Sequence, residues 1–169
     1  DHEGDIDGNG GIKRYLQLCD TLKLDLDYVK SCEGLLPASK FAVDAYVSFV
    51  GNRSLLEAIA SSLTEIYAPA IHAERISGLS KHYEWADDYA LAYFKKRIGQ
   101  ARKDVEFGRE WVIDNALTRD DQDAVLGAVR FKTEVLWAQL DALYYAYVDP
   151  GFIPPGAFVP NGFAERAWS

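Results

Sequence analysis

The sequence has no methionine, only two cysteines, and no apolar run close to the roughly 20 residues that a membrane-spanning helix needs. Two cysteines, Cys19 and Cys32, cannot form a disulfide framework, so we expect an intracellular, cytoplasmic protein. No signal peptide pattern is visible. The missing methionine and the abrupt start at Asp1 lead us to expect a trimmed product or a fragment.

Basic residues are also in deficit, because 18 Lys and Arg stand against 26 Asp and Glu and give a formal net charge of −8. An acidic chain disfavours nucleic acid and anionic membrane as partners, since both select basic surfaces. Hydrophobic residues make up 49% and aromatic residues 13%, which argues for a packed globule and against disorder. A length of 169 residues favours one domain.

Proline is nearly absent from the middle of the chain, where only Pro37 and Pro69 occur between residues 12 and 148. Four of the six prolines lie in the last 20 residues. No window alternates with period two, so the sequence predicts an all-α bundle of about six or seven helices. We expect a helical-bundle domain over residues 1–148 and a Pro/Gly-rich tail or linker over residues 149–169.

Helix boundaries follow from local signals. Pro37 suits the first turn of a helix that Gly51 and Asn52 would end. A helix starting near Ser54 should be kinked at Pro69. Thr118 with Asp121 resembles an N-terminal capping box. Further helices are expected over residues 12–22, 87–117 and 118–147.

Three chemically versatile side chains follow one another in the segment around Pro69. Glu65 and His72 are seven residues apart, which places them on one side of a helix, and Arg75 lies on an adjacent edge. This trio suits general acid–base chemistry. It also suits two metal ligands, or a buried polar group that satisfies itself.

A second candidate face carries Tyr93 and Arg97, which are four residues apart, and Tyr89 would extend it by one turn. An arginine on a semi-apolar face calls for an anionic partner. Lys132 lies in the most apolar helix, where a lysine either snorkels to the surface or meets an anion inside.

Other patterns are weaker. Asp5, Asp7 and Asn9 imitate an EF-hand loop, but the position of the bidentate carboxylate holds Leu16, so a solvated turn is favoured. A di-iron bundle needs a second Glu/His set, and the last helix offers no histidine. Neither cysteine has a histidine nearby in sequence, so nothing supports a thiol nucleophile.

Residues 41–49, 61–75, 93–106 and 131–147 together resemble the pyrroloquinoline quinone biosynthesis protein C family of quinone synthases, within the heme-oxygenase-like, TENA-like superfamily. The resemblance implies a bundle of about seven helices that acts as a homodimer. It also implies the last step of cofactor biosynthesis, in which an amino-acid-derived quinone precursor undergoes ring closure and an eight-electron oxidation by O2, giving pyrroloquinoline quinone and hydrogen peroxide. The family uses neither a metal nor an organic cofactor.

The resemblance also assigns residues. It implies that the catalytic groups are His72, His2, Tyr93 and Arg97, and that the substrate-binding groups are Glu65, Arg75, Lys132, Tyr46 and Thr64. The resemblance also implies a further N-terminal helical stretch, so we expect a cleaved or disordered segment before Asp1. The C-terminal tail is a candidate link to a small partner protein of the pathway.

Two alternatives from other classes stay open. One is a metal-dependent, di-iron oxygenase of the same bundle shape with Glu65 and His72 as ligands. The other is a non-catalytic bundle whose cations merely hold an anion. A thiaminase-like hydrolase is weaker, because its nucleophilic cysteine has no counterpart here.

Overall fold

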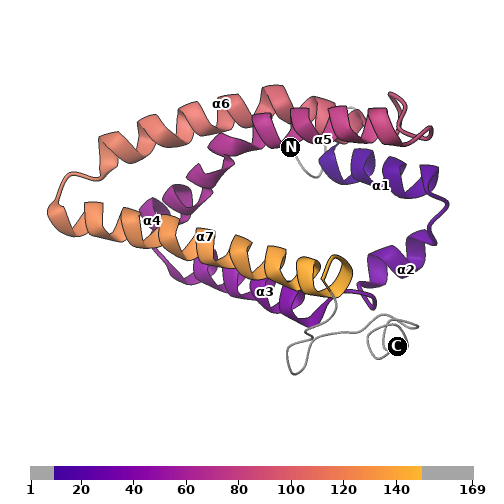
Figure 1. The fold of residues 1–169 in the computed structure, drawn as a ribbon. Helices are drawn as coiled ribbons and strands as arrows, with labels where there is room; N and C mark the ends of the chain where they lie inside the picture. The colour runs from indigo at the N-terminus through magenta and orange to yellow at the C-terminus, as the bar shows by residue number, and fades with distance from the viewer. Residues whose placement is uncertain (1–9, 150–169) are drawn as a thin grey trace. The chain divides into compact units, whose positions relative to one another are not determined.

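The computed structural model describes residues 10–149, and this part of the chain contains helices but no β-strand (Figure 1). The all-α class predicted from the sequence is therefore confirmed. No helix in the described range is long and apolar enough to cross a membrane. In chain order the elements are α1 (Gly11–Thr21), α2 (Leu26–Ser31), α3 (Pro37–Asn52), α4 (Leu55–Ser61), the 3₁₀ helix η1 (Ser62–Tyr67), α5 (Ala68–His82), α6 (Ala92–Asn115) and α7 (Arg119–Tyr147).

The chain divides into two compact units, which are described separately. Unit 1 comprises Glu65–Phe107 and the described part of Asp1–Gly34, and unit 2 comprises Leu35–Thr64 and the described part of Gly108–Ser169. Both η1 and α6 begin in one unit and end in the other.

In unit 2, α7 packs against α3 and α4 (Figure 1). Small buried residues, Ala60 and Ala128, lie at the centre of the contact and allow close approach of the helix backbones. Phe49 of α3 stacks on Phe131 of α7 with ring centroids 4.4 Å apart. The partly buried side chains around this core are Phe49, Leu56, Ile59, Leu63, Trp111 and Val125.

In unit 1, the buried positions cluster around the start of α6, where Leu91 and Phe94 are almost fully buried. Tyr15 of α1 meets α6 edge-to-face, with its ring centroid 5.3 Å from that of Tyr93 and 6.4 Å from that of Phe94. Aromatic packing therefore fixes α1 against α6.

Pro37 occupies the first turn of α3, which ends at Asn52, as the sequence predicted. The expectation of one kinked helix through Pro69 was wrong. The chain instead leaves α4 at Ser61, passes through η1 and restarts as α5, with Pro69 in its first turn. A proline clashes with the carbonyl four residues back, here that of Glu65, which disfavours a regular α-helix through this segment.

Two further boundaries differ from, or add to, the expectation. Helix α6 begins at Ala92 and not at Asp87, because the Asp87 carboxylate accepts the Ala90 N–H at 2.9 Å and forms a separate turn. Helix α2 was not predicted from the sequence, because six residues are too few to show a helical period. The side chain of Asp25 caps this helix by accepting the N–H groups of Asp27 and Tyr28.

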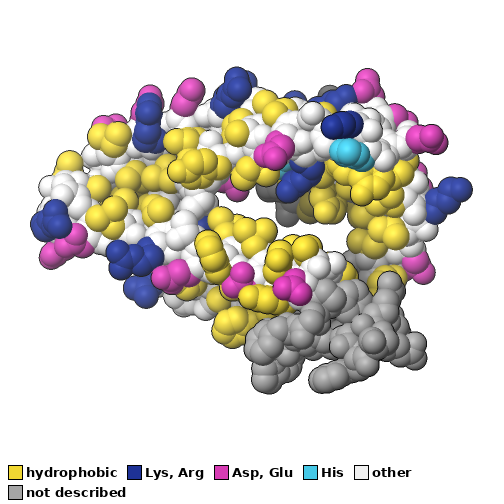
Figure 2. Space-filling model, viewed as in Figure 1, with side chains coloured by type: hydrophobic (Ala, Val, Ile, Leu, Met, Phe, Trp, Pro, Cys, Tyr) yellow, Lys and Arg dark blue, Asp and Glu magenta, His cyan; other side chains and the backbone are white. Residues whose placement is uncertain are grey.

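Hydrophobic side chains remain exposed along the second half of α7 (Figure 2). Trp137 is 70% exposed and Leu140 is 65% exposed. Both lie on the helix that the sequence predicted to be the most apolar one.

The capping box at the start of α7 is present, as predicted: Thr118 accepts the Asp121 N–H, and the Asp121 carboxylate accepts the Thr118 N–H. We expect Thr118→Ala to lower the free energy of unfolding by about 1 kcal/mol, because an N-terminal N–H loses its partner. Urea denaturation checks this. Thr133→Ala on the same helix is the control, because that hydroxyl only donates to the Arg130 carbonyl; an equal loss in both variants would contradict the capping role.

Candidate active site

His72 is the centre of the candidate site in unit 1. It projects from α5 toward α6, where its ring lies 6.2 Å from that of Tyr93 and 5.7 Å from that of Phe94, measured between centroids. Its Nδ1 atom is buried and has no hydrogen-bond partner within residues 10–149. Such an atom is available to a ligand that can donate or accept a proton.

Arg75 lies one helical turn after His72 on α5. Its guanidinium carbon is 5.2 Å from the centroid of the Phe94 ring, in cation–π contact. The same ring thus contacts both the imidazole and the guanidinium, and holds them on one side of α6.

Arg97 of α6 is held by two carboxylates. Its Nη2 donates to Glu65 Oε2 at 3.2 Å, and its Nη1 lies 3.6 Å from Asp104 Oδ2. Gln100 donates to the other oxygen of Asp104 at 3.0 Å. The Arg97 side chain is 13% exposed, so this pairing compensates a charge that is largely removed from water.

The surroundings of His72 set its protonation. Burial lowers the pKa of the imidazole below its usual 6.5, the charges of Arg75 and Arg97 lower it further, and Glu65 opposes them. Neutral imidazole, which can accept a proton, is therefore favoured at neutral pH.

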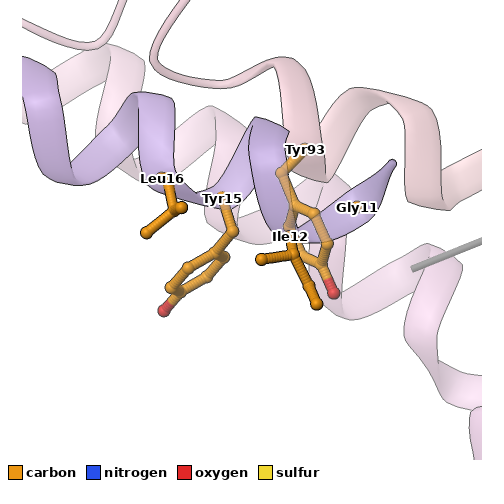
Figure 3. Close-up of a pocket in the computed structure, with 5 residues that line it drawn as sticks. All are labelled: Gly11, Ile12, Tyr15, Leu16 and Tyr93. Atoms are coloured by element: carbon orange, nitrogen blue, oxygen red, sulfur yellow. The ribbon is translucent and has the colours of Figure 1, made fainter. Parts of the chain in front are cut away.

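A small apolar pocket adjoins this cluster through Tyr93. It has a volume of about 170 Å³ and is lined by Gly11, Ile12, Tyr15, Leu16 and Tyr93. Figure 3 shows Tyr15 from α1 and Tyr93 from α6 among the side chains that line the pocket. One ring of the pocket wall therefore also contacts the imidazole.

Unit 2 contains a second cluster of polar residues. The Lys132 ammonium lies 3.3 Å from the centroid of the Tyr46 ring, so this lysine meets an aromatic face. The Tyr46 hydroxyl is 3.1 Å from Ser61 Oγ, and Thr64 Oγ1 lies 3.5 Å from the Ser61 carbonyl oxygen.

The predicted residues therefore fall into two sets. Unit 1 brings together Glu65, His72, Arg75, Tyr93 and Arg97. Unit 2 brings together Tyr46, Thr64 and Lys132. His2 and the calcium-like loop at Asp5, Asp7 and Asn9 lie outside the described residues. The catalytic and binding roles of all these residues stay predictions.

Some expectations need correction. Tyr89 lies in the turn before α6, not on the helical face of Tyr93, and its hydroxyl reaches Asp20 at 3.5 Å. Glu65 and His72 do not share one α-helix, because η1 ends between them, although their charges still interact.

Sequence reasoning gave no site role to Tyr15, Phe94, Asp104 or Ser61. Of these only Asp104 had a usable signal, since it is seven residues from Arg97 and thus on the same side of the helix. In the part of the chain that the structure describes, no group of three or more His, Cys, Asp or Glu is arranged to hold a metal ion.

Comparison with known proteins gives one consistent result. Residues 1–142 match the model of the TENA/THI-4/PQQC family. A pyrroloquinoline-quinone synthase of Rhizobium meliloti (strain 1021) is 60% identical over 158 residues, which is 94% of this chain and 62% of the relative. A protein of the same name from Rhizobium rhizogenes (strain K84 / ATCC BAA-868) is 56% identical, and the match covers 94% of this chain and 64% of the relative. Another from Ruegeria pomeroyi (strain ATCC 700808 / DSM 15171 / DSS-3) is 52% identical, and the match covers 95% of this chain and 66% of the relative. The chain spans less than two thirds of the length of these relatives. The family resemblance inferred from the sequence is confirmed.

The electrostatics of His72 can be measured directly. In an NMR titration of the imidazole we expect a midpoint below 6.5. Arg75→Ala should raise the midpoint, because it removes a cation, and Glu65→Gln should lower it further, because it removes the opposing anion. Midpoints that move in the reverse directions would contradict this assignment.

The free energy of unfolding should depend on the protonation of His72. Between the folded pKa of His72 and 6.5, the unfolded chain binds the proton and the folded chain does not. The His72 contribution to the free energy of unfolding therefore rises with pH through this window and is constant above it. Denaturation at a series of pH values should show that His72→Asn removes this slope, whereas a variant of the exposed His82 keeps it.

Proposed function

Because this chain belongs to the TENA/THI-4/PQQC family, we propose that it carries the reaction site of a pyrroloquinoline-quinone synthase. In this reaction an amino-acid-derived quinone precursor closes a ring and loses eight electrons to O2, giving pyrroloquinoline quinone and hydrogen peroxide. The observation that carries the proposal is a histidine whose pKa is lowered by burial and by the charges of Arg75 and Arg97, in a chain 60% identical to a protein of that name.

The substrate class is rich in carboxylates, and the cations match it. Arg75 and Lys132 both lie against ring faces, on Phe94 and Tyr46 respectively. A ring face attracts a cation without neutralising its charge, so the positive charge still acts on an anion. Arginine also binds a carboxylate through two parallel hydrogen bonds, which fixes the orientation of the ligand.

His72 is proposed as the proton carrier of the reaction. As a neutral base it accepts a proton lost from the precursor during ring closure and oxidation. The reduced precursor supplies the electrons, and O2 takes up electrons and protons to form hydrogen peroxide. Tyr93 and Arg97, one in ring contact with His72 and one acting on its charge, would stabilise the reduced oxygen species.

The reaction is proposed to need neither a metal nor an organic cofactor, since the electron-rich substrate can itself reduce O2. Glu65 supports this view: its carboxylate accepts a hydrogen bond from Arg97, and the cations Arg75 and Arg97 act on His72. A metal ion held by Glu65 and His72 would have to displace this pairing and tolerate two neighbouring positive charges.

The working assembly is proposed to be a cytoplasmic homodimer. The exposed apolar side chains of α7, Trp137 and Leu140 among them, favour burial against another surface. Cys19 and Cys32 are both free thiols, which suits a reducing compartment. A small pathway protein docked or fused at residues 149–169 is a further proposed partner.

The test of the function is O2 uptake after addition of the precursor, followed through formation of pyrroloquinoline quinone and hydrogen peroxide. Binding of the precursor without O2 uptake would favour an anion-holding bundle. Metal analysis of the same preparation is the second arm, and stoichiometric iron that tracks activity would favour a metal-dependent oxygenase.

His72→Asn should keep precursor affinity within about threefold and abolish product formation, because the amide cannot carry the proton. The matched control is His82→Asn, at the exposed C-terminal end of the same helix, which should leave turnover unchanged. An unaltered product yield in His72→Asn would contradict the acid–base role.

Arg97→Ala and Lys132→Ala should weaken precursor binding by about 1.5–3 kcal/mol each, the usual range for a charged hydrogen bond. Calorimetry under anaerobic conditions measures this, with exposed Lys96→Ala and Arg130→Ala as the controls on α6 and α7. Precursor affinity unchanged in both site variants would remove these residues from the binding site.

A further inference from the structure

Ser61, the last residue of α4, is a fully buried polar side chain with 0% of its surface exposed. Its hydroxyl lies 2.7 Å from the Ala58 carbonyl oxygen and 3.1 Å from the Tyr46 hydroxyl. All three residues belong to unit 2, so the arrangement does not depend on the other unit.

The direction of these two hydrogen bonds follows from counting protons. A carbonyl oxygen can only accept, so the single hydroxyl proton of Ser61 is directed to Ala58. The contact between Ser61 and Tyr46 then requires the other hydroxyl as donor. Tyr46 therefore donates to Ser61, and its own proton is committed to the protein.

This polarity decides what Tyr46 can offer a ligand. With its proton committed, the phenol oxygen presents lone pairs, and it can only accept a hydrogen bond from an N–H or O–H group. The same hydrogen bond helps to hold the ring on which the Lys132 ammonium lies at 3.3 Å. Ser61 thus acts on two predicted substrate-binding residues while remaining buried itself.

We propose that Ser61 is a positioning residue that fixes Tyr46 as a hydrogen-bond acceptor, so that the site selects a ligand carrying an N–H or O–H donor beside its anionic group. The selection of such a ligand rests on the proposed function, in which an amino-acid-derived precursor supplies both groups. The hydrogen bond itself does not rest on it, and can be tested without a ligand.

Ser62 provides a matched control. Its hydroxyl donates to the Ile59 carbonyl oxygen at 2.7 Å, the same local contact that Ser61 makes with Ala58. Ser62 is exposed, and it lies next to Ser61 in the chain. A variant of Ser62 therefore loses the same contact to the helix end but none to a tyrosine.

The first experiment reads the hydrogen bond in the whole chain by ultraviolet resonance Raman spectroscopy. The intensity ratio of the tyrosine Fermi doublet is low when the phenol donates and rises when it only accepts. Subtracting the spectrum of the corresponding Tyr46→Phe variant from that of each protein isolates the signal of Tyr46. We expect a donor spectrum in the parent chain and in Ser62→Ala, and loss of it in Ser61→Ala. An acceptor spectrum in the parent chain, or no change in Ser61→Ala, would overturn the proposal.

The second experiment is a double-mutant cycle on anaerobic precursor binding. Ser61→Ala should weaken binding about three- to tenfold, as expected for one neutral hydrogen bond, and should cause no further loss in a Tyr46→Phe background. Ser62→Ala should have no effect. Equal losses in the two backgrounds would show that Ser61 does not act through Tyr46, and would overturn its positioning role.

The two experiments separate two failures. Absence of precursor binding by the parent chain would refute the proposed function, and the Raman result would still decide the direction of the Tyr46 hydrogen bond. Circular dichroism and thermal unfolding of Ser61→Ala and Ser62→Ala show whether each variant keeps its fold. The substitution at Ser61 removes one buried oxygen and adds no volume, so we expect both to fold.

Discussion

The guanidinium of Arg97 is the constraint on which unit 1 depends. A permanent charge on a side chain that is 13% exposed needs anionic partners. Arg97 has two, Glu65 in η1 and Asp104 about two helical turns further along α6. The first pairing ties the 3₁₀ segment to α6. It also places a cation near His72, whose pKa is lowered by its charge. Local backbone geometry, helix packing and the protonation state of the imidazole are thus linked through one side chain.

The site uses its cations in two different ways. Arg97 is compensated by carboxylates, whereas Arg75 lies on the face of Phe94. A ring face lowers the cost of partial burial but leaves the net charge in place. A polyacidic ligand would therefore meet one cation that must exchange partners and one whose charge is not cancelled. Such a division allows strong attraction without leaving a cluster of unpaired charges in the absence of ligand.

Local signals were sufficient for much of the fold. Pro37 and the pair of Thr118 and Asp121 mark helix starts through backbone hydrogen bonds that involve only neighbouring residues, so the sequence alone predicts them. Pro69 was recognised as a disturbance, but whether a helix kinks or divides depends on tertiary packing. The contacts of Tyr15 with Tyr93, and of Ser61 with Tyr46, join residues 78 and 15 positions apart. No periodicity encodes such pairs, which is why the residues of both polar sets were named in advance but the supporting residues Tyr15, Phe94 and Ser61 were not.

The division of the chain has a consequence for its synthesis. The two segments of unit 1 are separated in sequence by Leu35–Thr64, which belongs to unit 2. The ribosome therefore synthesises this part of unit 2 before the two segments of unit 1 can pack together. Tyr93 leaves the ribosome 78 residues after Tyr15, a delay of roughly 4–16 s at about 5–20 residues per second. During that time the apolar face of α1, with Ile12, Tyr15 and Leu16, has not yet met its ring partners on α6. The nascent chain therefore exposes the apolar face of α1 to chaperones before the rings of α6 that it will contact have been made.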